Sequence, residues 1–150
     1  MCGLAFLLIS GLLVMSGCSQ AGLSSASTPE QDTQNLQGSW KLTQGTYDGE
    51  TISDDVRWTF SGDQVTVEVH GGRETSQFKL GVGGPRTIFV KHHDNPLAGQ
   101  GWIGGTLSGI YELSRDRLRV CYDMTGRSYP KRFDASKGSR RIIYQFVREK

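Results

Sequence analysis

Cysteine and histidine are scarce in this sequence, with 3 Cys and 3 His among 150 residues. Cys2 and Cys18 both lie in the N-terminal segment, so Cys121 is the thiol that the rest of the chain retains. One thiol cannot form an internal disulfide bond, which excludes a disulfide-stapled scaffold. The folded part must therefore be held together by side-chain packing and strand pairing.

The sequence also lacks an apolar run long enough to cross a membrane as a helix, which takes about 20 residues. Its longest apolar stretch is Leu4–Val14, and the hydrophobic region of a secretory signal is of similar length, about 7–15 residues. No Lys or Arg precedes the stretch, whereas signals usually begin with positive charge. A short buried apolar segment is the alternative interpretation.

Small residues follow this apolar stretch, and Ser16 and Gly17 stand directly before Cys18. The stretch Met15–Cys18 resembles the lipobox of bacterial lipoproteins, where a peptidase cuts before the cysteine once its thiol carries lipid. The resemblance implies that residues 1–17 are a removable signal peptide and that Cys18 carries lipid in the mature protein. It also implies a lipid-anchored protein of the bacterial cell envelope, with the membrane as a partner through lipidated Cys18.

The segment after the cysteine is polar. Residues 18–35 are rich in Ser, Thr, Gln, Ala and Gly and show no apolar period. Such a composition cannot bury enough apolar surface to fold. We therefore expect a flexible tether over residues 18–35, followed by one domain over residues 36–150.

From Leu36 onward, β-branched and aromatic residues alternate with polar ones between Gly, Asp and Ser clusters. In the clearest stretch, Val65, Val67 and Val69 face one way and polar residues face the other. We predict strands near residues 39–47, 56–60, 65–69, 75–80, 86–91, 108–113, 117–122 and 141–148, with no amphipathic helix. An open sheet of such strands has two exposed edges. We therefore predict an all-β fold, an eight-stranded up-and-down antiparallel barrel, with a two-sheet β-sandwich as the alternative.

Several short motifs of the predicted domain resemble known barrels. Leu36–Lys41 resembles the Gly-x-Trp opening of lipocalins. Gly109–Leu113 and Asp116–Cys121 resemble the signature of a lipocalin-like domain family of unknown function that is widespread in planctomycete bacteria. The resemblance extends over residues 36–150 and implies a lipocalin-like fold much more than an activity.

The same resemblance implies how one end of the barrel closes. In lipocalins the Trp of the first strand packs against an Arg from the end of the last strand. Gly38 and Trp40 match the opening motif, and Arg148 matches the arginine because the chain ends two residues later. A guanidinium can stack on an indole face and donate hydrogen bonds to loop carbonyls. These three residues would close the barrel structurally and would not bind a ligand.

A barrel of this size is filled by its own side chains or holds one small ligand. Our candidates for ligand-lining or lid residues are large and apolar: Trp58, Phe60, Phe78, Leu97, Trp102 and Ile103. The last three belong to a Gly-rich segment that departs from the family pattern. This segment would fold over an open barrel end, or Trp102 would simply fill the core.

Residues that suggest metal binding or catalysis are few. His92 and His93 are adjacent, so they point to opposite faces of a strand and cannot easily bind one ion, and His70 is remote in sequence. Cys121 alternates with arginines that can lower the pKa of a thiol, but no His stands beside it as a base. No serine elbow, paired-carboxylate motif, zinc spacing or phosphate loop is present. We expect no metal, no cofactor and no enzymatic activity.

Charge is unevenly distributed along the chain, although the formal net charge is only +2. From Leu113 to Lys150 there are 11 Lys and Arg residues and 4 Asp and Glu residues. A solvated outer face is the simple interpretation, and contact with anionic lipid headgroups is the alternative. We expect no nucleic-acid partner, because aromatic residues are not interleaved with the arginines as stacking platforms would be.

Together these patterns predict a lipid-anchored envelope lipoprotein whose lipocalin-like barrel binds a small apolar ligand. The alternative is a structural or protein-interaction module with a filled barrel and no ligand.

Overall fold

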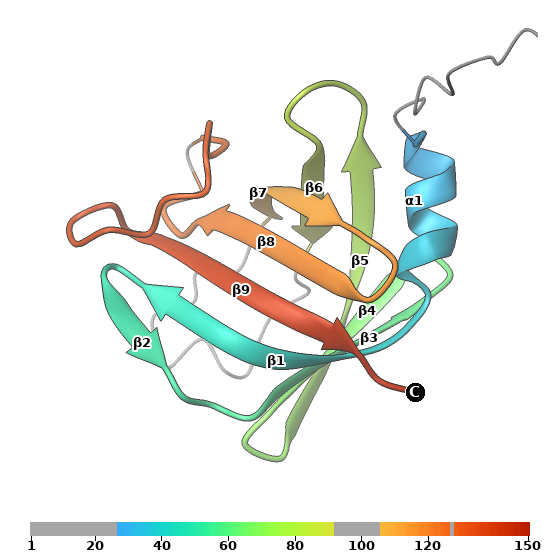
Figure 1. Ribbon diagram of the computed structural model, residues 1–150, viewed down its shortest axis with the longest axis horizontal. Helices are drawn as coiled ribbons and strands as arrows, with labels where there is room; N and C mark the ends of the chain where they lie inside the picture. The colour runs from blue at the N-terminus through green and yellow to red at the C-terminus, as the bar shows by residue number, and fades with distance from the viewer. Residues whose placement is uncertain (1–26, 92–105, 127) are drawn as a thin grey trace, which may run out of the picture.

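A computed structural model describes residues 27–91, 106–126 and 128–150 of the chain (Figure 1). Within these residues one helix precedes nine strands. The elements are α1 (Pro29–Leu36), β1 (Gly38–Tyr47), β2 (Glu50–Ile52), β3 (Val56–Ser61), β4 (Gln64–Val69), β5 (Gly72–Gly81), β6 (Thr87–Lys91), β7 (Thr106–Leu113), β8 (Arg117–Asp123) and β9 (Arg141–Arg148).

The strands form a closed antiparallel barrel, as the sequence predicted. Strand β1 pairs with β3 along one edge and with β9 along the other, so β1 and β3–β9 close a ring of eight strands. The short strand β2 pairs with the second half of β1. Because the ring closes, the prediction of an eight-stranded barrel is confirmed and the alternative of a two-sheet sandwich is wrong.

The alternation of residue types explains which face of each strand points inward. In β3, Val56, Trp58 and Phe60 are buried while the flanking Arg57 and Ser61 are exposed. The inward side chains of all eight ring strands contribute to one hydrophobic cluster, which also includes Leu36 of α1. This cluster fills much of the barrel and supplies most of the apolar burial that stabilises the fold.

Helix α1 corrects the expectation of a flexible tether up to residue 35, because residues 29–36 are helical. A capping box between Thr28 and Gln31 starts the helix, with Pro29 in its first turn. Only Asp32 and Leu36 of the helix are buried. The helix therefore has no apolar face that a hydrophobic period would reveal, and polar contacts described below hold it in place.

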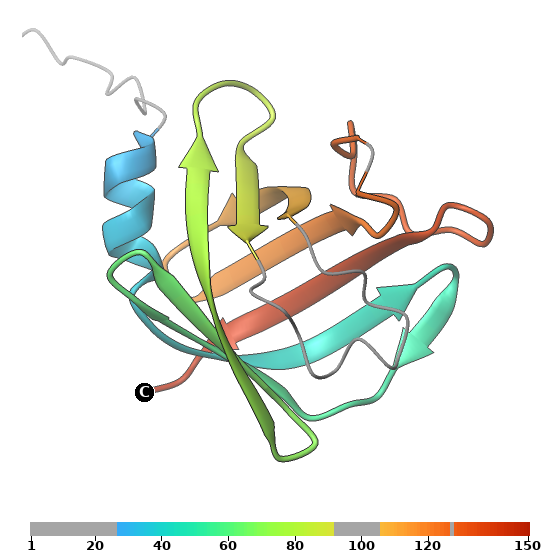
Figure 2. The same cartoon turned by 180° about the vertical axis from the view of Figure 1, so that it is seen from behind.

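The two ends of the barrel differ. The helix lies at the end where β1 begins and β9 ends, and Figure 2 shows it from behind at the same end as the C-terminus. We call this the plugged end. The opposite, far end is formed by the β1–β2 turn, the β4–β5 hairpin and the connection from β8 to β9 (Figure 1).

A second, smaller hydrophobic cluster lies on the outside of the barrel. It consists of Ile110, Cys121 and Ile143, which point outward from β7, β8 and β9, together with Ala135 and the partly buried Phe133. The connection between β8 and β9 thus folds back over the outer face of three strands.

Candidate functional site

The plugged end is closed by the pair that the resemblance implied. Trp40 is fully buried, and its Nε1–H donates a hydrogen bond to the carbonyl oxygen of Leu36 at 2.8 Å. The guanidinium carbon of Arg148 lies 4.2 Å from the centre of the Trp40 ring, and the two residues are direct partners in the β1–β9 pairing. This distance is typical of a cation–π contact.

The guanidinium of Arg148 also gathers the chain segments around it. It donates hydrogen bonds to the carbonyl oxygens of Gln37 at 2.7 Å and Arg115 at 3.1 Å, and to that of Asn35. Gly38 has a φ of +107°, and a Cβ there would lie 3.4 Å from Arg148 Nη1. Glycine at this position therefore permits both the backbone conformation and the close approach of the arginine.

A buried polar network fixes α1 across the plugged end. Asp32 is 2% exposed, and its carboxylate accepts hydrogen bonds from Tyr111 Oη at 2.6 Å and Ser27 Oγ at 2.6 Å. Arg86 Nη1 lies 3.1 Å from the same carboxylate. Burial, and then the hydrogen bond to Asp32, raise the pKa of Tyr111 well above its ordinary value, so the phenol stays protonated as a donor. The charge of Asp32 is thus compensated within the protein.

The interior next to the plugged end is tightly filled by rings and aliphatic side chains. The rings of Phe60 and Phe78 meet edge to face with centroids 5.0 Å apart, and those of Trp58 and Phe146 lie 4.8 Å apart. Phe60 and Phe78, two of the candidate ligand-lining residues, therefore pack here as core. Side chains packed this closely leave no room for a ligand in this half of the barrel.

The interior toward the far end is built differently. We define the far half as the inward positions Gly45, Ile52, Val67, Val69, Glu74, Leu107, Gly109, Tyr122, Met124 and Tyr144. Five apolar side chains here are only partly buried where they pack against the core: Ile52, Val67, Val69, Leu107 and Met124. Val56 and Ile142 face inward beside them and are buried. Apolar surface that remains accessible inside a barrel is suited to an apolar ligand.

Two inward positions of the far half carry glycine, and large side chains lie over them. A Cβ on Gly109 would come within 2.6 Å of both the Tyr122 ring and the carbonyl oxygen of Cys121, and one on Gly45 would lie 2.9 Å from Ile52 Cβ. Tyr122 and Tyr144 are the cross-strand neighbours of these glycines. Glycine at 109 therefore lets the Tyr122 ring lie close against the barrel wall, and glycine at 45 does the same for the Ile52 side chain.

Trp58 lies between the two halves and contacts both tyrosines. Its ring centroid is 6.1 Å from that of Tyr122 and 5.8 Å from that of Tyr144. Trp58 is 5% exposed and Tyr122 is 1% exposed, yet Trp58 Nε1 and Tyr122 Oη have no hydrogen-bond partner among the described residues. Burial raises the pKa of Tyr122 and of Tyr144 well above the ordinary value, so these phenols remain neutral. Most buried polar groups in proteins are paired, so these two unpaired donors require an explanation.

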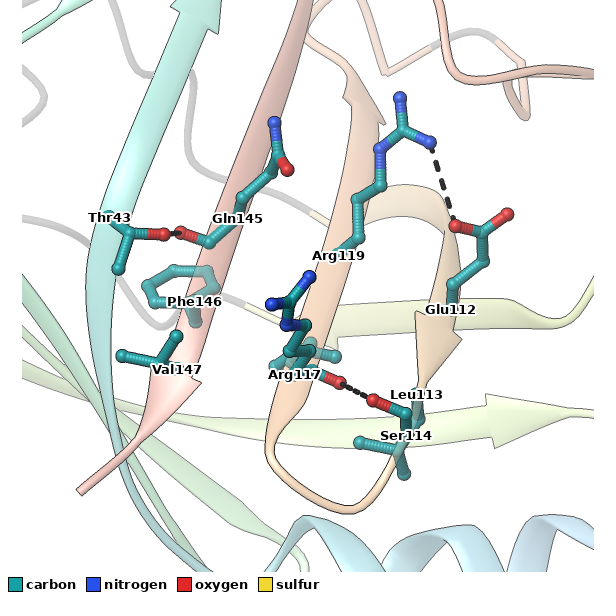
Figure 3. Close-up of a pocket in the computed structure, with 10 residues that line it drawn as sticks. Thr43, Glu112, Leu113, Ser114, Arg117, Arg119, Gln145, Phe146 and Val147 are labelled. Atoms are coloured by element: carbon teal, nitrogen blue, oxygen red, sulfur yellow. Dashed lines mark hydrogen bonds and ion pairs between the residues drawn. The ribbon is translucent and has the colours of Figure 1, made fainter.

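A groove also crosses the outer face of the barrel, over β1, β9, β8 and β7 (Figure 3). It has a volume of about 530 Å³ and is lined partly by Thr43, Gln145 and two arginines of β8. Arg119 Nη1 lies 3.5 Å from Glu112 Oε2, whereas no hydrogen bond or ion pair joins the Arg117 guanidinium to another described residue. This surface carries charges of both signs, as a solvated outer face does, and Arg119 Nε is buried there without a hydrogen-bond partner among the described residues.

The remaining candidates do not form a reactive site within the described residues. Cys121 is fully buried in the outer cluster, and burial raises the pKa of its thiol. His70 is exposed and pairs with Asp54 at 3.0 Å. Across residues 27–91, 106–126 and 128–150, no three His, Cys, Asp or Glu side chains come together in a way that could hold a metal ion.

Several sequence-predicted residues lie outside the described part of the chain: Cys18, His92, His93, Leu97, Trp102 and Ile103. The lipidation and lid hypotheses therefore remain predictions. In the part of the chain that the structure describes, no helix has the length and apolarity needed to span a membrane.

Comparison with solved structures relates the barrel to lipocalin-like proteins. The chain is similar to a lipocalin-like protein from Bacteroides uniformis, with 19% identity, a TM-score of 0.51, and coverage of 77% of this chain and 99% of the other. For an uncharacterized protein from Bacteroides eggerthii the identity is 14%, the TM-score 0.47, and the coverage 76% and 99%. No family model and no curated protein matches the sequence. The similarity to the Bacteroides uniformis protein shows a lipocalin-like fold, and the resemblance to the planctomycete family remains an expectation.

Proposed function

We propose that this lipocalin-like barrel is a lipoprotein of the bacterial cell envelope that binds a small apolar molecule in the far half of its interior. The observation that carries the proposal is the contrast between the two halves. The plugged half is filled with close-packed rings, whereas the far half has partly accessible apolar side chains and unpaired buried donors nearby. Small-ligand sites typically combine an apolar lining with a few polar groups that orient the ligand.

The proposed membrane anchor is compatible with this use of the barrel. Lipid on Cys18 would hold the protein at a membrane, and the chain from Cys18 enters the domain through α1 at the plugged end. The far end would then remain accessible to a ligand while the protein stays attached. The proposal for the anchor is supported by the apolar stretch Leu4–Val14 and the small residues before Cys18.

The proposed binding can be tested with naphthalene as a small apolar probe and the full chain held in lipid nanodiscs. We expect the methyl NMR signals of Val67 and Val69, which face the far half, to shift as the probe is added. Val147 points outward from β9 and is 38% exposed, so its signals provide the matched control and should not move. Unchanged signals for all three valines would favour the alternative, a filled barrel that serves as a structural or interaction module.

A further inference from the structure

Trp58 and Tyr122 offer two hydrogen-bond donors to the same part of the interior. The indole nitrogen of Trp58 can only donate, and a neutral phenol carries one O–H donor. The two rings are in contact, with centroids 6.1 Å apart and planes inclined by 42°. A single small molecule in contact with both rings therefore meets two residues whose donors are unpaired. Buried water molecules satisfy such donors in many proteins.

The described residues at the inward strand positions near these donors carry charge of one sign. Among the described residues, the inward strand positions of the far half carry no Lys, Arg or His, and the charged side chains on this face are Glu50 and Glu74. Arg86 and Arg148 point inward only at the plugged end, where Asp32 and main-chain carbonyls occupy them. With no cation among these described positions, a carboxylate ligand in the far half would be buried near Glu74 without charge compensation, which is unfavourable.

From this juxtaposition we infer that the ligand of the far half is a neutral, largely apolar molecule that carries a hydrogen-bond acceptor, such as the carbonyl oxygen of a ketone, ester or amide. The acceptor binds to Trp58 Nε1 and Tyr122 Oη while the apolar body contacts Val67, Val69 and Leu107. Fatty-acid anions and plain hydrocarbons bind less well. The inference rests on the proposed function, since it specifies the ligand class of the same site.

Three naphthalene derivatives of similar size separate these possibilities: 2-acetonaphthone, 2-ethylnaphthalene and 2-naphthoate. They would be titrated into the full chain in lipid nanodiscs, with tryptophan labelled with nitrogen-15 so that the Trp58 indole N–H is observed directly. Its signal is assigned by its loss in Trp58→Phe. We expect the ketone to bind about tenfold more tightly than the hydrocarbon, as one net hydrogen bond allows, and to shift the Trp58 N–H signal downfield. The carboxylate should bind more weakly than the ketone.

The variant Tyr122→Phe removes the hydroxyl and keeps the ring. It should reduce the ratio of ketone to hydrocarbon affinity about three- to tenfold. Comparing this ratio between proteins cancels the different partitioning of the two probes into the bilayer. Tyr129→Phe is the matched control, because Tyr129 is exposed and packs against Phe89 on the outside of the barrel. If Tyr122→Phe unfolds, the same ratio measured in Trp58→Phe tests the other donor.

The outcomes distinguish the inference from the proposed function. A ketone preference that Tyr122→Phe or Trp58→Phe removes, and Tyr129→Phe retains, supports the inference. Equal affinity for ketone and hydrocarbon, or tightest binding of the carboxylate, overturns the inference but leaves a small-ligand barrel in place. Binding of none of the three probes overturns both.

Discussion

The contact between Trp40 and Arg148 provides a quantitative test of the barrel closure. Trp40→Ala removes a fully buried ring, and truncation of a buried aromatic residue typically costs ~3–5 kcal/mol in the free energy of unfolding. It also removes the hydrogen bond from the indole to the carbonyl of Leu36, which couples β1 to the end of α1. We therefore expect a destabilisation toward the upper part of that range.

Arg148→Ala should cost less, because its guanidinium is only partly buried and its hydrogen bonds end on carbonyl groups that water can reach. The double variant should be less destabilised than the sum of the single variants. The expected coupling energy is about 0.5–2 kcal/mol. Cation–π contacts contribute the lower value at exposed sites and the upper value where the pair is desolvated. Each single change already destroys the contact at 4.2 Å, so it is counted twice in the sum.

Urea unfolding monitored by far-UV circular dichroism measures these free energies. The signal does not depend on the fluorescence of the tryptophan that is replaced. Trp40→Ala, Arg148→Ala and the double variant would be compared under one set of conditions. Strict additivity of the three values would show that the two side chains do not stabilise each other. A Trp40→Ala variant within about 0.5 kcal/mol of the wild type, as at an ordinary surface position, would refute the closure itself.

Four further predictions follow from other parts of the molecule. Tyr111→Phe leaves the buried carboxylate of Asp32 without one donor at 2.6 Å and should cost about 1–3 kcal/mol in urea unfolding; wild-type stability would show that this network does not hold α1. The raised pKa of Tyr111 means that the unfolded chain loses the phenolic proton first, so stability should fall as the pH rises above ~10, and a urea midpoint constant from pH 8 to 11 would contradict this. Gly109→Ala, whose Cβ would meet backbone at 2.6 Å, should destabilise by about 1–3 kcal/mol, whereas Gly84→Ala, with nothing within 4 Å, should stay near wild type; equal stabilities would refute the close approach. Cys18→Ser should abolish labelling with radioactive palmitate, and continued labelling would disprove the proposed anchor.

The strands of the barrel could be predicted because their sequence alternation is strong. The valines at 65, 67 and 69 lie on one face of β4, and β3 and β5 show the same alternation. The contact between Trp40 and Arg148 could be predicted only from the resemblance to lipocalins, because no local pattern links residues at opposite ends of the domain.

Helix α1 was missed for a physical reason. Besides Leu36, Asp32 holds it on the barrel; the partner Tyr111 is 79 positions away in the chain, and a polar residue in a polar stretch gives no sign of burial. The outer cluster was missed as well, although the run Ile142-Ile143-Tyr144 carries its signal. Three consecutive apolar residues in a strand indicate burial on both faces, and here the connection from β8 to β9 covers the second face.

The candidate site was predicted only in part. Trp58 was among the expected ligand-lining residues, whereas Tyr122 was not. Their polar atoms have no partner among the described residues. This lack of a partner depends on packing between β3 and β8, which are not paired strands. Such a property follows from the closed geometry and not from any single strand.

Native mass spectrometry of the full chain, purified from its membrane, tests the central claim most directly. We predict that the protein retains a small molecule after gentle release from the membrane. Val67→Trp should lose it because the new ring fills the far half, and the outward Val147→Trp should retain it. If the wild type and both variants each show only the mass of the protein itself, with no retained molecule, the result would contradict the account.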